Sequence, residues 1–221
     1  DAVLSQTKQH HPVYVALVNG PEGPGQTVDE KFKLAAEIVR QAKENHGVTP
    51  DQLLIDVNAY PIGSESLEGL NFCAETLKCL PLIKAIHPDL KTSVGVGNLT
   101  NGLASKPYMR KVLTSVFLDE ARKAGLDCAI LNPHHYVPLE SLTESDVKLA
   151  RKVILDRDMT AFEELEVIAQ TKKTGVQIKK IDYDDLALEE SICQRIKDGF
   201  KQKEEGIINK EGGEFAYKDK I

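Results

Sequence analysis

Four short apolar runs, each followed by a helical pattern, constrain the fold of this chain more than any other feature. The apolar runs are short and rich in β-branched residues, which is typical of strands buried on both faces. In the intervening segments, apolar residues recur at the three- and four-residue spacing of a helix face. Such alternation requires a parallel sheet covered by helices, in either an open doubly wound sheet or part of a barrel. The four runs are residues 13–18, 53–55, 91–97 and 128–131.

Local signals predict where the helices begin and end. Thr27 and Glu30 have the spacing of a capping box at the start of the first long helix. Gly47 stands at a left-handed position that ends this helix. Pro81 lies inside the second long helix and predicts a kink or a break there. Helices are expected over residues 27–46, 66–86, 106–125, 143–154 and 160–171.

A polar residue follows each apolar run. These residues are Asn19, Asp56, Asn98 and Asn132. The carboxyl ends of parallel strands meet at one edge of a sheet, and ligands bind at that edge in both candidate architectures. The sequence therefore predicts a shared binding site at this edge, which we call the C-terminal rim.

The segment KTSVGVGNLTNG, residues 91–102, is the central part of the predicted site. Gly95 and Gly97 carry no Cβ, so a flat ligand could lie against the backbone there. Asn98 can both donate and accept a hydrogen bond, which suits the mixed edge of a heterocycle. The alternative interpretation is a glycine-rich loop with an asparagine turn and no ligand.

Composition excludes several classes of protein. The chain has 221 residues and a net charge of −6 without a basic block, which argues against nucleic acid as a partner. We find no apolar run of about 18 residues and no secretion leader, so neither a membrane span nor export is expected. The four cysteines form no zinc spacing and indicate free thiols in a reducing, cytoplasmic compartment. His134 and His135 are adjacent but lack a third ligand, so no metal site is predicted.

Three motifs together resemble the pterin-binding methyltransferases, the family of the folate domain of cobalamin-dependent methionine synthase and of O-demethylase methyltransferase components. They are Asp56 after LLI, GVGN at residues 95–98 and GLDCAILNP at residues 125–133. The runs NFCAETLKCLPLIKAIHPDLKTSVGVGNLTNGL and ESDVKLARKVILDRDMTAFEELEVIAQ are also similar. The resemblance covers roughly residues 13–170, and the order and spacing of the motifs carry it.

The resemblance implies the C-terminal part of a (β/α)8 TIM barrel, beginning near the fifth strand. The chain thus looks truncated, without the first four strands, since a barrel needs eight. We expect residues 1–174 to form this barrel portion. Residues 175–221 are expected to add a C-terminal helix and a polar tail, of which residues 189–206 faintly resemble the first helix of a corrinoid-binding module.

The resemblance also implies a reaction and its residues. The substrate would be tetrahydrofolate or 5-methyltetrahydrofolate, with cobalamin carried by a corrinoid protein or domain, and the enzyme would be a dimer. In the family, the residue matching Asp56 binds the amino-pyrimidine edge of the pterin, and the residue matching Asn98 reaches N5 and serves catalysis. Asn19, Asn101, Gly95 and Gly97 match further positions near the pterin.

Two alternatives stay open at this point. Dihydropteroate synthase shares the pterin barrel, but its basic residues after the last two strands are replaced here by GNLTNG and LNPHH. The second alternative is a non-catalytic fragment that serves only as a docking or structural half.

Overall fold

The computed structural model describes residues 2–62, 69–172, 187 and 189–190. The chain divides into two units, Asp1–Thr174 and Gly175–Ile221, and the fold described below is that of the first. The predicted helix and tail of residues 175–221 lie almost entirely outside the described residues.

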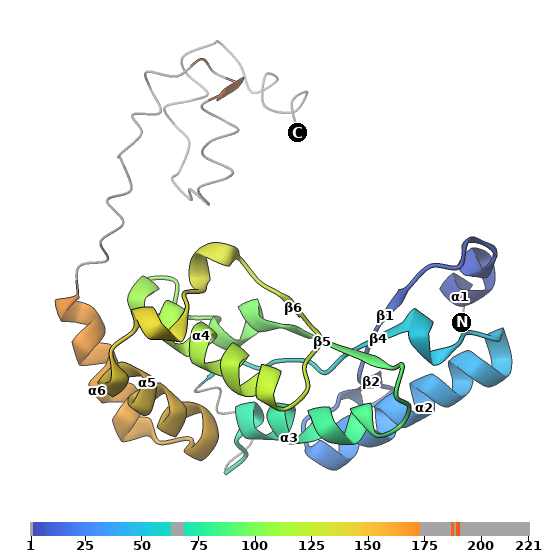
Figure 1. The fold of residues 1–221 in the computed structure, drawn as a ribbon, viewed down its shortest axis with the longest axis horizontal. Helices are drawn as coiled ribbons and strands as arrows, with labels where there is room; N and C mark the ends of the chain where they lie inside the picture. Colours follow the sequence, from blue (N-terminus) through green and yellow to red (C-terminus); the bar gives the residue numbers. More distant parts are fainter. Residues whose placement is uncertain (1, 63–68, 173–186, 188, 191–221) are drawn as a thin grey trace. The chain divides into compact units, whose positions relative to one another are not determined.

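A four-stranded parallel sheet forms the centre of the first unit (Figure 1). Its spatial order, β1-β4-β5-β6, follows the order of the strands in the sequence. Right-handed crossovers that always advance in one direction place every connecting helix on the same face. A doubly wound sheet reverses its strand order and is covered on both faces. The observed order is therefore compatible with part of a TIM-like barrel. The strands are β1 (Tyr14–Leu17), β4 (Leu53–Asp56), β5 (Lys91–Gly95) and β6 (Cys128–Ile130).

The crossover helices α2, α3 and α4 follow one another along the sheet in the order of the strands (Figure 1). Beyond β6, the chain returns through α5 and α6, which pack against α4. A two-residue hairpin, β2 (Asn19–Gly20) with β3 (Gly23–Pro24), precedes α2. Among the residues the structure describes, no helix is both long and apolar enough to cross a membrane. The helices are α1 (Ala2–Thr7), α2 (Val28–His46), α3 (Phe72–Lys84), α4 (Pro107–Lys123), α5 (Glu144–Arg151) and α6 (Met159–Thr171).

The two faces of the sheet differ in burial. On the helix-covered face, Ile55 is fully buried and Val94 is 1% exposed. On the other face, Val15, Leu17 and Ile130 are 50%, 48% and 61% exposed. These three residues lie on the two edge strands, β1 and β6. We call the uncovered side the open face; in a closed barrel, the face of the sheet opposite the helices lines the interior, where apolar side chains are covered.

The structure confirms the predicted helix signals at α2. Thr27 and Glu30 form the complete capping box, and Gly47 ends the helix with a φ of 67°. The expectation for α3 was partly wrong, because Gly69 has a φ of 82° and Asn71 caps a helix that begins at Phe72. Residues 66–68 of the predicted helix lie outside the described part. The helix continues past Pro81 and ends one turn later, so a break there is not observed.

Two strand predictions also need correction. β5 ends at Gly95 rather than residue 97, because Val96–Thr100 forms a 3-10 turn. The run 128–131 was interpreted as a buried strand, but Cys128 and Ile130 of β6 are exposed. The reason is topological, since β6 is an edge strand and no layer formed by the described residues covers its side chains on the open face.

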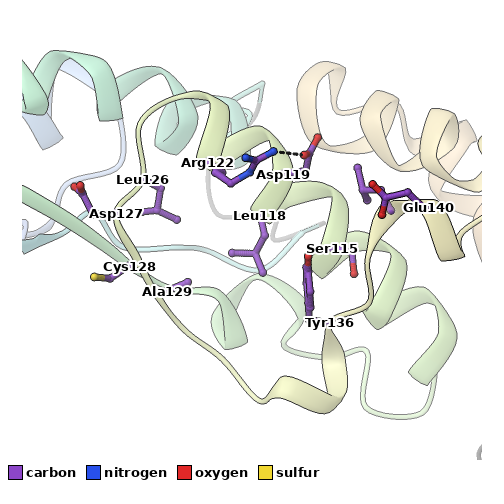
Figure 2. A pocket seen from close by; sticks show the side chains of 11 residues that line it. Ser115, Leu118, Asp119, Arg122, Leu126, Asp127, Cys128, Ala129, Tyr136 and Glu140 are labelled. Carbon is purple, nitrogen blue, oxygen red and sulfur yellow. Dashed lines mark hydrogen bonds and ion pairs between the residues drawn. The ribbon is translucent and has the colours of Figure 1, made fainter.

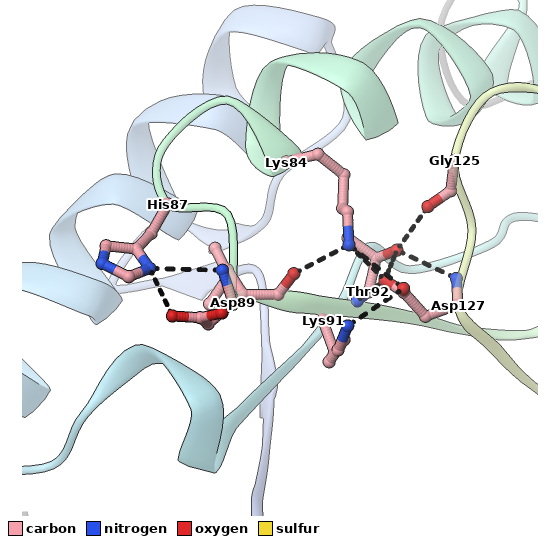
Figure 3. A network of polar contacts seen from close by, with 8 residues as sticks. Lys84, His87, Asp89, Lys91, Thr92, Gly125 and Asp127 are labelled. Carbon is pink, nitrogen blue, oxygen red and sulfur yellow. Dashed lines mark hydrogen bonds and ion pairs between the residues drawn. The ribbon is translucent and has the colours of Figure 1, made fainter.

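A polar network fixes the amino ends of the last two strands (Figure 3). The carboxylate of Asp127 accepts hydrogen bonds from the Thr92 backbone N–H at 2.8 Å and from Lys84 Nζ at 2.9 Å. Lys84 Nζ also donates to the carbonyl oxygen of Leu90 at 3.0 Å. This network ties α3 to β5 and β6 at the edge opposite the C-terminal rim.

Candidate functional site

Asp56 is the last residue of β4 and is only 8% exposed. Its Oδ1 accepts a 3.0 Å hydrogen bond from the backbone N–H of Asn58. Burial raises the pKa of Asp56, and this effect is opposed by the Asn58 N–H and by the positive charge of Lys31. A carboxylate in such a position is costly to ionise without partners. It is therefore suited to accept hydrogen bonds from a ligand that brings its own N–H donors.

Asn58 connects Asp56 to Asn19. The amide of Asn58 donates from Nδ2 to Oδ1 of Asn19 at 2.8 Å. Asn58 has a left-handed backbone with a φ of 53°, which asparagine tolerates better than most residues. The structure thus brings the ends of β1 and β4 together through a residue that the sequence analysis did not select.

Lys31 lies behind this turn and is fully buried. Its Nζ donates to the carbonyl oxygen of Val57 at 2.5 Å and to that of Asn58 at 3.1 Å. The ammonium also lies 5.0 Å from the centre of the Tyr60 ring. Burial lowers the pKa of Lys31 to about 8. A single cation from α2 therefore contacts both carbonyl groups that follow Asp56.

Asn98 lies in the 3-10 turn that follows β5, and it is exposed. Its Nδ2 lies 3.6 Å from the position that a Cβ on Gly95 would occupy. Gly95 and Ser93 alternate with Thr92 and Val94, and Ser93 pairs in register with Asp56. Asn98 therefore folds back over the face of the sheet that carries Asp56. A Cβ at Gly97 would meet no atom within 4 Å, so that position is open.

A basic pair lies beside the Asn98 turn. Nε of Arg110 donates to Oγ1 of Thr100 at 3.2 Å, and its Nη1 lies 3.4 Å from Nε2 of His135. Burial, followed by the charge of Arg110, lowers the pKa of His135. Asn132 uses its side chain locally, because its Oδ1 accepts from the His134 N–H at 3.0 Å. In the described part of the chain, the Asn101 side chain forms no hydrogen bond with the other predicted residues.

The chain is similar to known folate and corrinoid enzymes. It is 31% identical over 202 residues to methionine synthase of Mycobacterium tuberculosis, and 29% identical over 196 residues to that of Mycobacterium leprae. It is 27% identical over 148 residues to the methylcorrinoid:tetrahydrofolate methyltransferase of Eubacterium limosum. The chain belongs to the folate–corrinoid methyltransferase family. No family model matches it.

The matches cover most of this chain but only part of its relatives. They include 89% and 86% of the chain for the two methionine synthases, and 67% for the E. limosum protein. The chain spans 17% and 16% of the methionine synthases and about half, 51%, of the E. limosum protein. The two methionine synthase matches cover so much of the chain that both must include Asp56 and Asn98.

The sequence analysis did not select Lys31 or Asn58 as residues of the site. A signal for Lys31 was present, because it lies four residues before Ala35 and eight before Val39, on the buried stripe of α2. A lysine at such a position indicates a buried polar partner. No comparable signal marked Asn58, since its contact with Asn19 joins residues 39 positions apart.

A hollow of about 340 Å³ lies outside the rim, beside edge strand β6 (Figure 2). It is bounded by β6, by α4 and by the loop that carries Tyr136 and Glu140. None of the predicted site residues lines it.

Proposed function

We propose that this chain is the folate-binding part of a methyltransferase that moves a methyl group between N5 of tetrahydrofolate and the cobalt of a corrinoid protein. The observation that carries the proposal is the buried carboxylate of Asp56. It lies at the C-terminal rim of a barrel-like sheet, on the same face as the Asn98 side chain, in a member of this family.

Asp56 would bind the amino-pyrimidine edge of the pterin. Two ring N–H donors can meet the two oxygens of one carboxylate, and charge-assisted hydrogen bonds are stronger than neutral ones. One oxygen already accepts from Asn58 at 3.0 Å, which orients the group. Asn58 and Asn19 would then border the same ring system.

Asn98 would act at N5. When the methyl group leaves N5 for the cobalt, the N–C bond breaks and its electron pair stays on the nitrogen; in the reverse direction, N5 donates that pair. The corrinoid of the partner supplies the methyl acceptor or donor. An amide positioned at N5 stabilises the change of charge there, and such preorganised donors contribute most in the transition state.

The fold part of the proposal is that four further strand–helix units complete the barrel. They would pair with the free edges of β1 and β6, cover Val15, Leu17 and Ile130 on the open face, and fill the hollow beside β6. The location part of the proposal is a reducing, cytoplasmic compartment, which suits a chain with free thiols. Among the described cysteines, Cys73 and Cys79 are buried and Cys128 is exposed on the edge strand β6.

Calorimetric titration tests the function. Tetrahydrofolate and 5-methyltetrahydrofolate are titrated into the 221-residue chain and into a version to which four strand–helix units are added at the N-terminus. Binding by the extended version alone supports both the function and the missing strands. Binding by both supports the function but contradicts the missing strands. If neither version binds, the pterin assignment is wrong.

A further inference from the structure

We propose that Lys31 is a positioning residue of the rim, because its buried ammonium holds the turn after β4 so that Asp56 and Asn58 face the ligand. The assignment of the turn to a pterin ligand rests on the proposed function. The coupling between Lys31 and Asp56 does not, and it can be measured without any ligand.

The geometry is the first argument. Lys31 comes from α2, whereas the two carbonyl oxygens it contacts belong to Val57 and Asn58 on the loop after β4. Thr76 of α3 donates to the same Asn58 oxygen at 3.1 Å. Two helices thus hold one turn. From this turn, the Asn58 backbone N–H donates to Asp56, and the Asn58 side-chain amide donates to Oδ1 of Asn19 and, at 3.4 Å, to the carbonyl oxygen of Val18.

The second argument is the cost of burying a charge. A lysine side chain is almost never fully buried without an ionic partner. Among the ion pairs of the described residues, none includes Lys31. Its charge is compensated by two carbonyl dipoles and an aromatic ring. A methionine would fill the same space at less cost, so the retained charge favours a role in the site.

The third argument is the effect of that charge on Asp56. Several titratable groups face Lys31 from three elements: Asp56 of β4, Glu75 and Cys79 of α3, and Glu30 of α2. The Lys31 charge opposes the raised pKa of both Cys79 and Asp56, and of these two groups Asp56 lies at the rim. Lys31 therefore helps to keep Asp56 ionised, as an acceptor of N–H donors requires.

The experiment is a ¹³C NMR titration of the aspartate carboxyl groups in the 221-residue chain. Lys31→Met is compared with Lys33→Met, which removes an exposed lysine from the same helix. We expect Lys31→Met to raise the pKa of Asp56 by about one unit, the range of a nearby charge. We also expect faster hydrogen exchange at the Asn58 amide. Lys33→Met should change neither quantity. An unchanged Asp56 pKa together with an unchanged Asn58 exchange rate would overturn the proposal.

A reciprocal variant covers the case in which Lys31→Met does not fold. Coupling between two sites is symmetric, so Asp56→Asn must lower the pKa of Lys31 by a similar amount. The ε-carbon resonance of Lys31 reports it, with Asp89→Asn as an exposed control. A Lys31 pKa that stays at its wild-type value would refute the coupling. Failure of the folate titration with intact coupling would instead count against the proposed function alone.

Discussion

The side-chain amide of Asn98 lies beside the Cα of Gly95 at the end of β5. The Nδ2 of Asn98 lies 3.6 Å from the position of a Cβ on residue 95, which is an ordinary van der Waals distance. The glycine is therefore not required by the packing of the free protein. Its bare backbone leaves room on the open face of the sheet, beside the amide that we assign to N5.

The first prediction concerns this glycine. Gly95→Ala should leave the thermal midpoint of the protein within about 2 °C, because the new methyl group lies at an ordinary van der Waals distance from its neighbour, Asn98. It should weaken tetrahydrofolate binding about tenfold or more, because the methyl group occupies ligand space. Differential scanning fluorimetry and calorimetric titration of a folate-competent version measure the two effects. Unchanged affinity would show that the pterin does not approach Gly95.

The second prediction concerns Asn98. Asn98→Ala should lower kcat by about 100-fold or more, the effect of removing one transition-state donor. Tetrahydrofolate binding should weaken only a few fold, since the contribution arises as the charge at N5 changes. Single-turnover methyl transfer and calorimetry separate the two quantities, and Asn45→Ala serves as a control at an exposed asparagine of α2. Equal losses of rate and affinity would exclude the transition-state role.

The third prediction concerns stability and Asp56. Burial raises the pKa of this carboxyl above its unfolded value, so ionisation of Asp56 costs more in the native state than in the unfolded chain. Its stabilising contribution is present below the unfolded pKa of about 4 and is lost as the pH rises through the folded pKa. Asp56→Asn should therefore raise the thermal midpoint at pH 7 while folate binding is lost. A lower midpoint would mean that the ionised group stabilises the fold.

The fourth prediction concerns the hydrogen bonds that Lys172, at the end of α6, makes with Asp146 and Tyr108. Lys172 donates to Asp146 at 2.5 Å and to the Tyr108 hydroxyl at 2.7 Å, and Asp146 is 2% exposed. Burial alone would raise the pKa of Asp146, but the hydrogen bonds from Lys172, Tyr108 and Thr143 lower it. The stabilisation is then present above the unfolded pKa of about 4 and is lost as the pH falls through the folded pKa.

Asp146→Asn should accordingly lower the free energy of unfolding at pH 7 by roughly 3 kcal/mol, as for a broken buried pair. The difference from the wild type should shrink toward zero near pH 2. Urea unfolding at several pH values measures it, and Asp89→Asn is a control at an exposed site. A pH-independent difference would assign the effect to packing rather than to charge.

The sequence by itself determined the local elements and the family. Hydrophobic spacing, the capping box at Thr27 and the left-handed Gly47 depend on neighbours within one or two turns, so they are readable without the fold. The sequence also predicted that Asp56 and Asn98 follow the ends of two strands. Because the carboxyl ends of parallel strands lie at one edge of a sheet, the strand pattern predicted a shared location for both residues.

Only the tertiary structure decided which face of each element is covered. Residues 128–131 have the composition of a buried strand, yet β6 is an edge strand and Ile130 is exposed. Lys31 can be buried because carbonyl oxygens 26 and 27 residues away accept hydrogen bonds from its ammonium group. Asn58 joins the site through contacts between separate strand ends. Such features depend on partners far apart in the chain, and local periodicity carries no information about them.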